Sequence, residues 1–500
     1  MKGFKSKRSS GDDGISMDTL KKLSDSVCSP IAMIVNMSLE QGVVPDGMKL
    51  AKVIPIYKAK SRESFTNYRP ISLLSNISKI LEKVVHRRLY SFIEKHDILY
   101  NGQYGFRPGR STIDALTQFT ADVLPSLDRK DFCLSVFLDL SKAFDTINHC
   151  TLFDKLKHYG IRGKALDWFK SYLDQRRQYV CYGESKSNLL DVEYGVPQGS
   201  VLGPLLFILY SNDLSLCLEH SKTIIFADDT TLYIMGSNPV DIGNKMNADL
   251  KILSDWFRAN KLSVNPSKTK YMMFSKKGVL PRQPIDLHMD GHTLDQVAST
   301  KFLGIFFDQH LTWDVHIEYC RKKIAQGMYA MHMSKHLLKI HHLKIIYHSL
   351  VHSHLSYGIL LWGNTYQKHL HKLEIAQKKC IRIIAGAQYN ASTSKFFKKL
   401  DILKLKDMYR HTLGLFMYNF MQKELPGPLL TIYNLHGDSH EHNTRHRTDP
   451  IAPNVNAEVM RKSYLYSGPI IWMSLNNSLK SSKNKRQFRA GMKRFLIGDY

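Results

Sequence analysis

A short stretch, residues 223–235 (TIIFADDTTLYIM), constrains the fold more than any other part of the chain. Two apolar, β-branched runs flank a polar turn that holds Asp228 and Asp229, a pattern typical of a β-hairpin with two carboxylates at its tip. Aspartate is also common in ordinary turns, because its side chain accepts hydrogen bonds from nearby backbone N–H groups. The hairpin alone therefore leaves open whether these acids have a chemical role.

A third carboxylate follows another apolar run. Residues 134–140 (LSVFLDL) have the length of a strand, and Asp139 lies near its end, where it either emerges from the core or binds a cation. Carboxylates on neighbouring strands, about 4.8 Å apart, can hold the two divalent cations used in nucleotidyl transfer. Clustered carboxylates would otherwise repel one another, and hard oxygen ligands favour Mg²⁺ or Mn²⁺. We therefore expect two metal ions, Mg²⁺ or alternatively Mn²⁺, at this site.

Strand and helix patterns alternate around the hairpin from residue 134 to residue 307, which indicates an α+β fold close to a split βαβ sheet. Ser111 and Asp114 predict a capping box at the start of a helix. The expected helices cover 80–93, 151–159, 164–175 and 242–257, and the expected strands lie at 51–58, 179–182, 189–194, 301–307 and within 260–274. Beyond residue 311 the apolar spacing is helical, and Pro426, Gly427 and the polar run 437–450 suggest a linker before a final small unit.

Charge points to the class of partner. The 500 residues include 70 Lys and Arg against 44 Asp and Glu, a formal net charge of +26, which favours a nucleic-acid partner over a merely basic soluble protein. The seven cysteines show no CxxC spacing, as expected of reduced thiols inside a cell rather than of a zinc site. The histidines at 436, 440, 442 and 446 lack accompanying cysteines, so no zinc is expected there. Neither a secretory signal nor a membrane span is expected.

Several motifs occur in a fixed order. They are YRPISLLS (68–75), QYGFRPGRST (103–112), FLDLSKAF (137–144), GVPQGSVLGP (195–204), FADD (226–229), NPSKTK (265–270) and FLG (302–304). In this order they resemble the motifs of reverse transcriptases of non-LTR (LINE-type) retrotransposons, the jockey-like and CR1-like group in particular. An ordered series of motifs is far more specific than any single one.

The resemblance implies a right-hand polymerase fold, with fingers, a palm built on the split βαβ antiparallel sheet, a helical thumb and a small C-terminal extension. The implied divisions are an N-terminal segment and fingers (1–132), a reverse transcriptase domain (38–308), a palm (133–310), a thumb (311–400) and an extension of unknown role (401–500). The residues 9–16 (SSGDDGIS) resemble the N-terminal motif of the polymerase itself, so the endonuclease of full-length relatives is expected to be absent.

Catalytic roles follow from the same resemblance. Asp139 and Asp228 would be the principal metal ligands with the Leu140 carbonyl beside them, and Asp229 would be the third carboxylate. Lys268 would protonate the pyrophosphate leaving group, with Lys270 as the competing candidate.

Substrate contacts are also implied. The dNTP would contact Lys58, Arg69, Gln198 and Gly199, and the ring of Phe144 would exclude a ribose 2′-hydroxyl. The residues Phe302, Leu303 and Gly304 resemble the primer grip, although structural packing would explain them equally well. The residues expected to track the nucleic-acid backbone are Arg107, Arg110, Lys372, Lys378, Lys379 and Arg382.

The resemblance implies an RNA-directed DNA polymerase that copies an RNA template from a DNA primer with dNTPs, as in target-primed retrotransposition, in the nucleus. Two alternatives stay open at this point. The chain could be a catalytically silent nucleic-acid-binding derivative of such an element, or a reverse transcriptase of the group II intron maturase type. Intact Asp139, Asp228 and Asp229 argue against the first, and the residues 350–363 (LVHSHLSYGILLWG), which resemble the jockey-like group, argue against the second.

Overall fold

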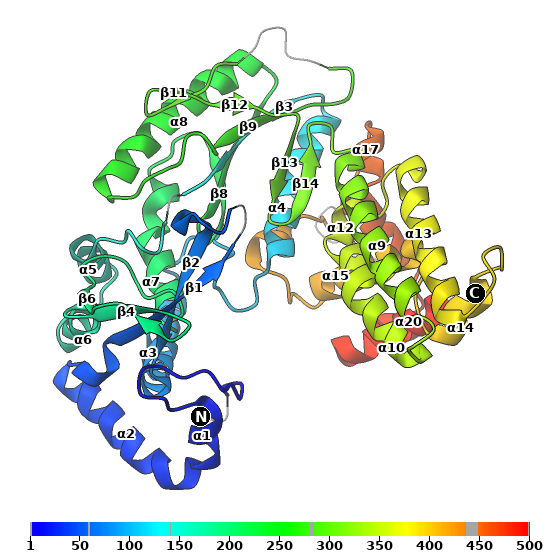
Figure 1. Cartoon of the computed structure of the whole chain (residues 1–500). Helices are drawn as coiled ribbons and strands as arrows, with labels where there is room; N and C mark the ends of the chain where they lie inside the picture. The colour runs from blue at the N-terminus through cyan, green and yellow to red at the C-terminus, as the bar shows by residue number, and fades with distance from the viewer. Residues whose placement is uncertain (1–2, 59–60, 141, 280–284, 437–448, 499) are drawn as a thin grey trace.

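A five-stranded sheet forms the centre of the computed structural model, which describes residues 3–58, 61–140, 142–279, 285–436, 449–498 and 500 (Figure 1). Its strand order is β12-β9-β3-β8-β7, and β3 is antiparallel to both of its neighbours, β8 and β9. The strands are β3 (Phe132–Leu138), β7 (Lys222–Phe226), β8 (Asp229–Gly236), β9 (Lys270–Phe274) and β12 (Asp295–Gln296). The expected α+β fold with an antiparallel sheet around the hairpin is confirmed.

Alternating side chains of β3 enter two different cores. Leu134 and Val136 point into one core with α7 (Gly203–Tyr210) and α8 (Pro239–Ala259), whereas Cys133 belongs to the core that contains α4 (Thr112–Asp128). This follows from the two-residue period of a strand. The apolar run 201–210 forms α7, whose side chains are almost wholly buried.

A second sheet lies beside the first (Figure 1). It contains β1 (Leu50–Tyr57), β2 (Tyr68–Leu74), β4 (Arg177–Tyr182), β5 (Ser185–Lys186) and β6 (Leu190–Asp191). The expected strand at 189–194 is mostly wrong, because only two residues of it pair with β4, and β5 was not expected. The surrounding helices are α1 (Met17–Lys22), α2 (Ser24–Gln41), α3 (Asn76–Lys95), α5 (His149–His158) and α6 (Lys164–Leu173), with short turns η1 (Asp46–Met48), η2 (Phe65–Asn67) and η3 (Asn212–Leu216). The hairpin of β10 (His288–Met289) and β11 (His292–Thr293) follows β9 and packs against α8.

The expectation of one strand at 301–307 is wrong. The chain instead forms a separate hairpin of β13 (Ser299–Phe302) and β14 (Ile305–Asp308). The turn between them places Leu303 at φ 43° and Gly304 at φ 88°, and glycine adopts such a conformation without the steric cost that other residues bear. An apolar run that contains a turn glycine therefore reads as one strand while folding as two.

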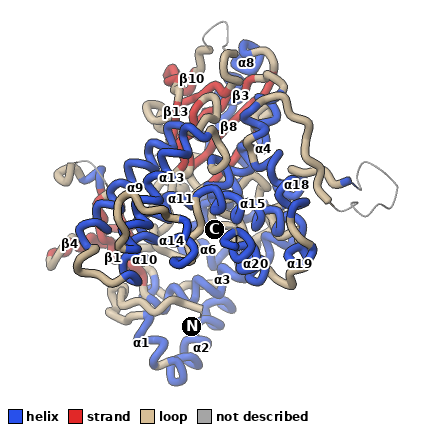
Figure 2. Tube along the Cα trace, turned by 90° about the vertical axis from the view of Figure 1, so that its right-hand side faces the viewer, coloured by secondary structure: helices blue, strands red, loops and turns tan. Residues whose placement is uncertain are grey.

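Helices make up the rest of the described chain, as expected. They are α9 (Asp314–Ser334), α10 (Ile340–Tyr347), η4 (His348–His352), α11 (Ser353–Ser356), α12 (Ile359–Trp362), α13 (Gln367–Ala385), α14 (Ser394–Leu400), α15 (Leu405–Met421), η5 (Gly427–Thr431), α17 (Glu458–Arg461), α18 (Tyr464–Ser474), α19 (Asn477–Lys480) and α20 (Lys485–Gly498). Figure 2 shows them side by side in one body. The helices on both sides of residue 400 share a single apolar core, in which α15 packs against α12, α18 and α20. No helix in the described ranges is long and apolar enough to cross a membrane.

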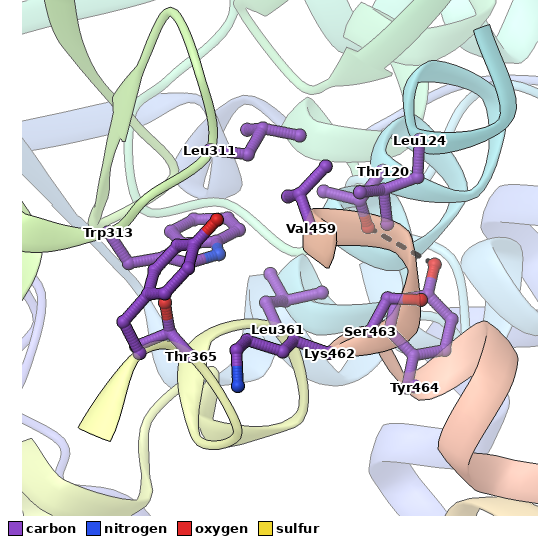
Figure 3. A pocket seen from close by; sticks show the side chains of 11 residues that line it. Thr120, Leu124, Leu311, Trp313, Leu361, Thr365, Val459, Lys462, Ser463 and Tyr464 are labelled. Carbon is purple, nitrogen blue, oxygen red and sulfur yellow. Dashed lines mark hydrogen bonds between the residues drawn. The ribbon is translucent and has the colours of Figure 1, made fainter. Parts of the chain in front are cut away.

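Helix α4 joins this body to the central sheet. Its capping box, with Ser111 and Asp114 bonded to each other's backbone N–H, is confirmed. At its other end Asp128 Oδ1 accepts hydrogen bonds from the backbone N–H groups of Asn456 and Ala457, at 2.8 and 2.5 Å. Figure 3 shows Tyr464 reaching Thr120 of α4 beside a small pocket, and the Tyr464 hydroxyl also donates to the Thr117 carbonyl at 2.6 Å.

Candidate active site

The hairpin of β7 and β8 presents two acids at the end of the central sheet. Phe226 pairs with Asp229, so only Ala227 and Asp228 form the turn, and Ala227 adopts φ 60°. Both aspartates are exposed. The expected hairpin is confirmed.

Asp139 lies at the same end of the sheet. Leu138 is the last residue of β3 and pairs with Thr230 of β8, so Asp139 continues the strand beside Asp229. Although Asp229 keeps exposed surface, the protein around its carboxyl group removes part of the hydrating water, and this effect, together with the negative charges of Asp228 and Asp139, raises its pKa to about 6. The fold therefore brings Asp139 beside the two adjacent acids Asp228 and Asp229, which are far from it in the sequence.

A lysine neutralises one of these charges. Lys268 Nζ lies 3.1 Å from Asp139 Oδ2. The backbone holds the two segments together, because Asn265 N donates to the Asp139 carbonyl at 2.9 Å and Leu140 forms a bridge with Val264. Lys270, the competing candidate, is instead a residue of β9 that pairs with Phe137.

The donor set fits a hard divalent cation in its chemistry. Within the described ranges, however, no three acidic, histidine or cysteine side chains are grouped as a finished metal cage. Asp139 is paired with Lys268 instead. If Asp139 and Asp228 are to share a cation, Asp139 must exchange Lys268 for that ion.

Residues 102–111, most of which belong to the motif QYGFRPGRST, hold the turn of the β7–β8 hairpin. Tyr104 N donates to the Ile225 carbonyl at 2.7 Å, and Ile225 N donates to the Gly102 carbonyl at 2.9 Å. The buried Gln103 side chain accepts from Gly105 N and Ala227 N, at 2.8 and 3.3 Å. A Cβ atom on Gly105 would lie 2.2 Å from Ala227 N. The sequence signal for this contact was the pair of glycines on both sides of Gln103, since glycine permits close approach of two backbones.

The two arginines of this segment serve the fold. Arg107 is buried, with Nη2 3.1 Å from Glu94 Oε1 and Nη1 donating to the Tyr100 carbonyl. Arg110 donates to the carbonyls of Asn101 and Gln103. Both arginines thus hold this segment in place, and their contact with a nucleic-acid backbone stays a prediction.

The glycine-rich loop 195–204 lies against the second sheet, which contains β1, β2 and β4–β6. Gln198 Nε2 donates to Asp145 Oδ1 at 2.7 Å, and its carbonyl accepts from Ser72 N of β2 at 2.8 Å. Residue 199 must be glycine, because its φ is 131° and a Cβ atom there would lie 2.5 Å from the Ser72 carbonyl oxygen. Burial raises the pKa of Asp145, and the hydrogen bond from Gln198 opposes this shift. The structure thus joins the loop to the strand that contains Arg69.

The remaining residues expected to contact the dNTP are accessible. Phe144 is half-buried and stacks on Phe207, with ring centroids 4.6 Å apart. Lys58 and Arg69 are exposed at the end of the β1–β2 hairpin where residues 58–67 connect the strands, and neither side chain forms a hydrogen bond or ion pair with another described residue.

Glu82 is a supporting residue that the sequence analysis missed. Its buried carboxylate accepts from Val201 N and Leu202 N, at 2.5 and 3.1 Å, just before α7 begins. Burial raises the pKa of this carboxyl, and the two backbone donors oppose the shift. No sequence signal distinguished it, because Glu82 lies in an ordinary amphipathic helix.

The residues expected to grip the primer form the turn between β13 and β14. Phe302 is buried against Phe119, Phe137 and Phe307, and Leu303 and Gly304 form the turn itself. Of the expected backbone-tracking cations on α13, Lys372 and Lys378 are exposed. Lys379 lies over the Tyr389 ring, and Arg382 Nε donates to the Ala391 carbonyl at 2.9 Å. Of the four histidines considered for zinc, all but His436 lie outside the described residues.

Comparison with known proteins gives one family. The family model described as "Reverse transcriptase (RNA-dependent DNA polymerase)" matches residues 56–307. The probable RNA-directed DNA polymerase from transposon BS of Drosophila melanogaster is 31% identical over 82% of this chain and 47% of its own length. The RNA-directed DNA polymerase from mobile element jockey, also of Drosophila melanogaster, is 28% identical over 80% of this chain and 44% of its own length.

The chain spans about half the length of these curated relatives. Among solved structures, telomerase from Candida albicans, in a complex with a fragment of telomeric RNA, aligns with 75% of this chain and 69% of its own, at 13% identity. The TM-score is 0.42, too low to carry an argument about this chain.

Proposed function

Because the chain belongs to the reverse transcriptase family, whose members are RNA-dependent DNA polymerases, we propose that it copies RNA into DNA by extending a primer 3′-hydroxyl with dNTPs. The observation that carries the proposal is the convergence of Asp139, Asp228 and Asp229 at one end of the central sheet. The source we propose is a non-LTR retrotransposon of the jockey-like group, in which such copying starts at a nicked target.

The three carboxylates would hold two Mg²⁺ ions, or Mn²⁺ in their place. Asp139 and Asp228 would be the principal ligands, with the Leu140 carbonyl beside them and Asp229 as the third acid. When bound, the ions would activate the primer hydroxyl and stabilise charge on the phosphate. Lys268 would donate a proton to the leaving pyrophosphate, a role supported by its ion pair with Asp139.

The incoming dNTP would lie between the three carboxylates and the second sheet, which contains β1, β2 and β4–β6. Arg69 and Lys58 would bind its triphosphate, because both side chains are exposed and their charges are not paired with a described acid. Gln198 and Gly199 would line the base and sugar, held in position by Asp145 and Ser72.

The nucleic acid would then run from this centre past the helices that follow residue 311. We assign residues 1–132 to an N-terminal segment and fingers, 133–310 to the palm and 311–400 to the thumb; 38–308 form the reverse transcriptase domain. Lys372 and Lys378, both exposed on α13, would contact phosphates of the template and primer. Residues 401–500, which share the core of the thumb helices, would stabilise the thumb.

Primer extension tests the proposal directly. Purified protein, an RNA template with an annealed DNA primer, dNTPs and Mg²⁺ should give extended DNA, and Asp228→Ala should abolish it. Asp154→Ala is the matched control, because Asp154 is an exposed acid on α5 with no hydrogen-bond or ion-pair partner among the described residues. Equal extension by Asp228→Ala and wild type would refute the site. No extension by the wild type would favour a silent nucleic-acid-binding protein.

A further inference from the structure

Tyr357, which precedes α12, contacts both the β13–β14 turn and the start of α4. The Tyr357 hydroxyl donates to the Leu303 carbonyl at 2.6 Å. It also lies 3.1 Å from the Thr112 hydroxyl, at the first residue of α4. Tyr357 belongs to the motif LVHSHLSYGILLWG, to which the proposed mechanism gives no role.

The Tyr357 hydroxyl has two acceptors at this junction, the Leu303 carbonyl at 2.6 Å and the Thr112 hydroxyl oxygen at 3.1 Å. A phenol has one proton, so the two acceptors share it, and the nearer carbonyl is the stronger partner. The Tyr357 hydroxyl thus links the β13–β14 turn to the start of α4.

The β13–β14 turn packs closely against the Tyr357 ring. A Cβ atom on Gly304 would lie 3.0 Å from Cε1 of Tyr357, so a larger residue would crowd the phenol. Leu303 has φ 43°, a left-handed conformation that is strained for a leucine and needs support from its surroundings. The hydrogen bond from Tyr357 acts on the carbonyl of this strained residue.

Tyr357 is itself held firmly. The wholly buried Trp362 donates from Nε1 to the Tyr357 carbonyl at 3.0 Å. Gly358 follows at φ 62°, and a Cβ atom there would lie 2.3 Å from Ile305 Cδ1. The backbone on both sides of the ring is therefore fixed against β14 and the thumb core, while the ring keeps 37% of its surface exposed.

We propose that the Tyr357 hydroxyl is a positioning group for polymerisation, which fixes the β13–β14 turn relative to the catalytic hairpin and so places the primer 3′ end. The inference deepens the proposed function and rests on it. Thr112 follows directly on the segment 102–111, which contacts the turn of the β7–β8 hairpin through Gln103 and Gly105. The β13–β14 turn and the turn of the β7–β8 hairpin are thus both held by the continuous stretch 102–112.

The test is Tyr357→Phe, which keeps the ring and removes only the hydroxyl. The lost hydrogen bond should lower kcat for single-nucleotide addition about three- to tenfold. The Kd for the primer–template duplex and the melting temperature should stay at wild-type values. Tyr329→Phe is the matched control, since Tyr329 is exposed on α9 and forms no hydrogen bond with a described residue.

A second variant tests the hydrogen bond between Tyr357 and Thr112. Thr112→Val should lower kcat in the wild-type background and have no added effect in Tyr357→Phe. Additive losses, a wild-type kcat in Tyr357→Phe, or a parallel loss of duplex binding and melting temperature would each overturn the inference. If the wild type extends no primer, both the function and the inference fail; if only Tyr357→Phe behaves as wild type, the inference alone fails.

Discussion

Lys268 Nζ lies 3.1 Å from Asp139 Oδ2, although 129 positions separate the two residues. A cation that binds Asp139 must compete with this ammonium group. Both side chains are more than two-fifths exposed, and exposed ion pairs contribute about 0.2–1 kcal/mol. The pair is therefore strong enough to modulate metal affinity and too weak to prevent binding.

We predict that Lys268→Gln binds Mn²⁺ about two- to fivefold more tightly than wild type in the absence of nucleic acid, as the free energy of such a pair implies. Calorimetric titration measures this directly. Lys270→Gln is the control, because Lys270 forms no ion pair with a described acid. Unchanged or weaker Mn²⁺ binding in Lys268→Gln would mean that the ion pair and the metal do not compete.

Gly105→Ala should disturb the catalytic hairpin. The new Cβ atom would lie 2.2 Å from Ala227 N, and backbone atoms cannot move away as a flexible side chain does. We expect a loss of about 1–3 kcal/mol in the free energy of unfolding and about 100-fold in kcat, because the adjacent Asp228 would be displaced. Denaturant titration and primer extension measure the two effects. Gly47→Ala, where no atom lies within 4 Å of the new Cβ, should change neither.

Phe144→Val should admit ribonucleotides. A smaller side chain removes the ring that would meet a 2′-hydroxyl, and loss of one such contact changes discrimination by about 10- to 100-fold. The measurement is the ratio of kcat/KM for dNTP and rNTP. This ratio is insensitive to stability lost from the stack with Phe207. An unchanged ratio would leave Phe144 with packing as its sole role.

The junction between α4 and the C-terminal helices should be essential for stability. Asp128→Ala leaves the backbone N–H groups of Asn456 and Ala457 without their acceptor, at a cost of about 2–4 kcal/mol for one part-buried and one buried hydrogen bond. Asp128→Asn retains a carbonyl oxygen and should cost less than half of that. Equilibrium unfolding distinguishes the two variants. Equal losses would indicate that the negative charge, rather than the acceptor, matters.

The helical body should lose stability in mild acid. Burial, reinforced by neighbouring Lys301 and His354, lowers the pKa of His316 from its usual 6.5 to about 4. The unfolded chain therefore binds a proton between pH 6.5 and 4 that the folded chain does not, and stability falls as the pH falls through this window. His316 alone should remove on the order of 2 kcal/mol between pH 7.5 and 5.

His316→Asn tests this assignment, because its side-chain oxygen can still accept the hydrogen bond that Phe306 N donates to His316 Nδ1. Denaturant unfolding at pH 7.5 and pH 5 should show a smaller pH dependence in the variant. His352, whose pKa burial also lowers to about 4, should account for part of the dependence that remains. The same dependence in variant and wild type would exclude His316 as its source.

Local patterns were enough to predict much of the fold. The β7–β8 hairpin, the capping box at Ser111 and the helices after residue 311 depend on interactions between near neighbours, which periodicity and turn residues reveal. The hairpin of β13 and β14 escaped notice because one glycine turned a continuous apolar run into two strands.

By itself the sequence determined the elements, the order of the motifs and the identity of the three carboxylates. Only the tertiary structure decided which side chains are free to act. It buried Arg107 against Glu94, paired Lys268 with Asp139 and brought Tyr357 to the Leu303 carbonyl. These contacts join segments from distant parts of the chain, and no local pattern encodes them, because each depends on how the surrounding cores pack.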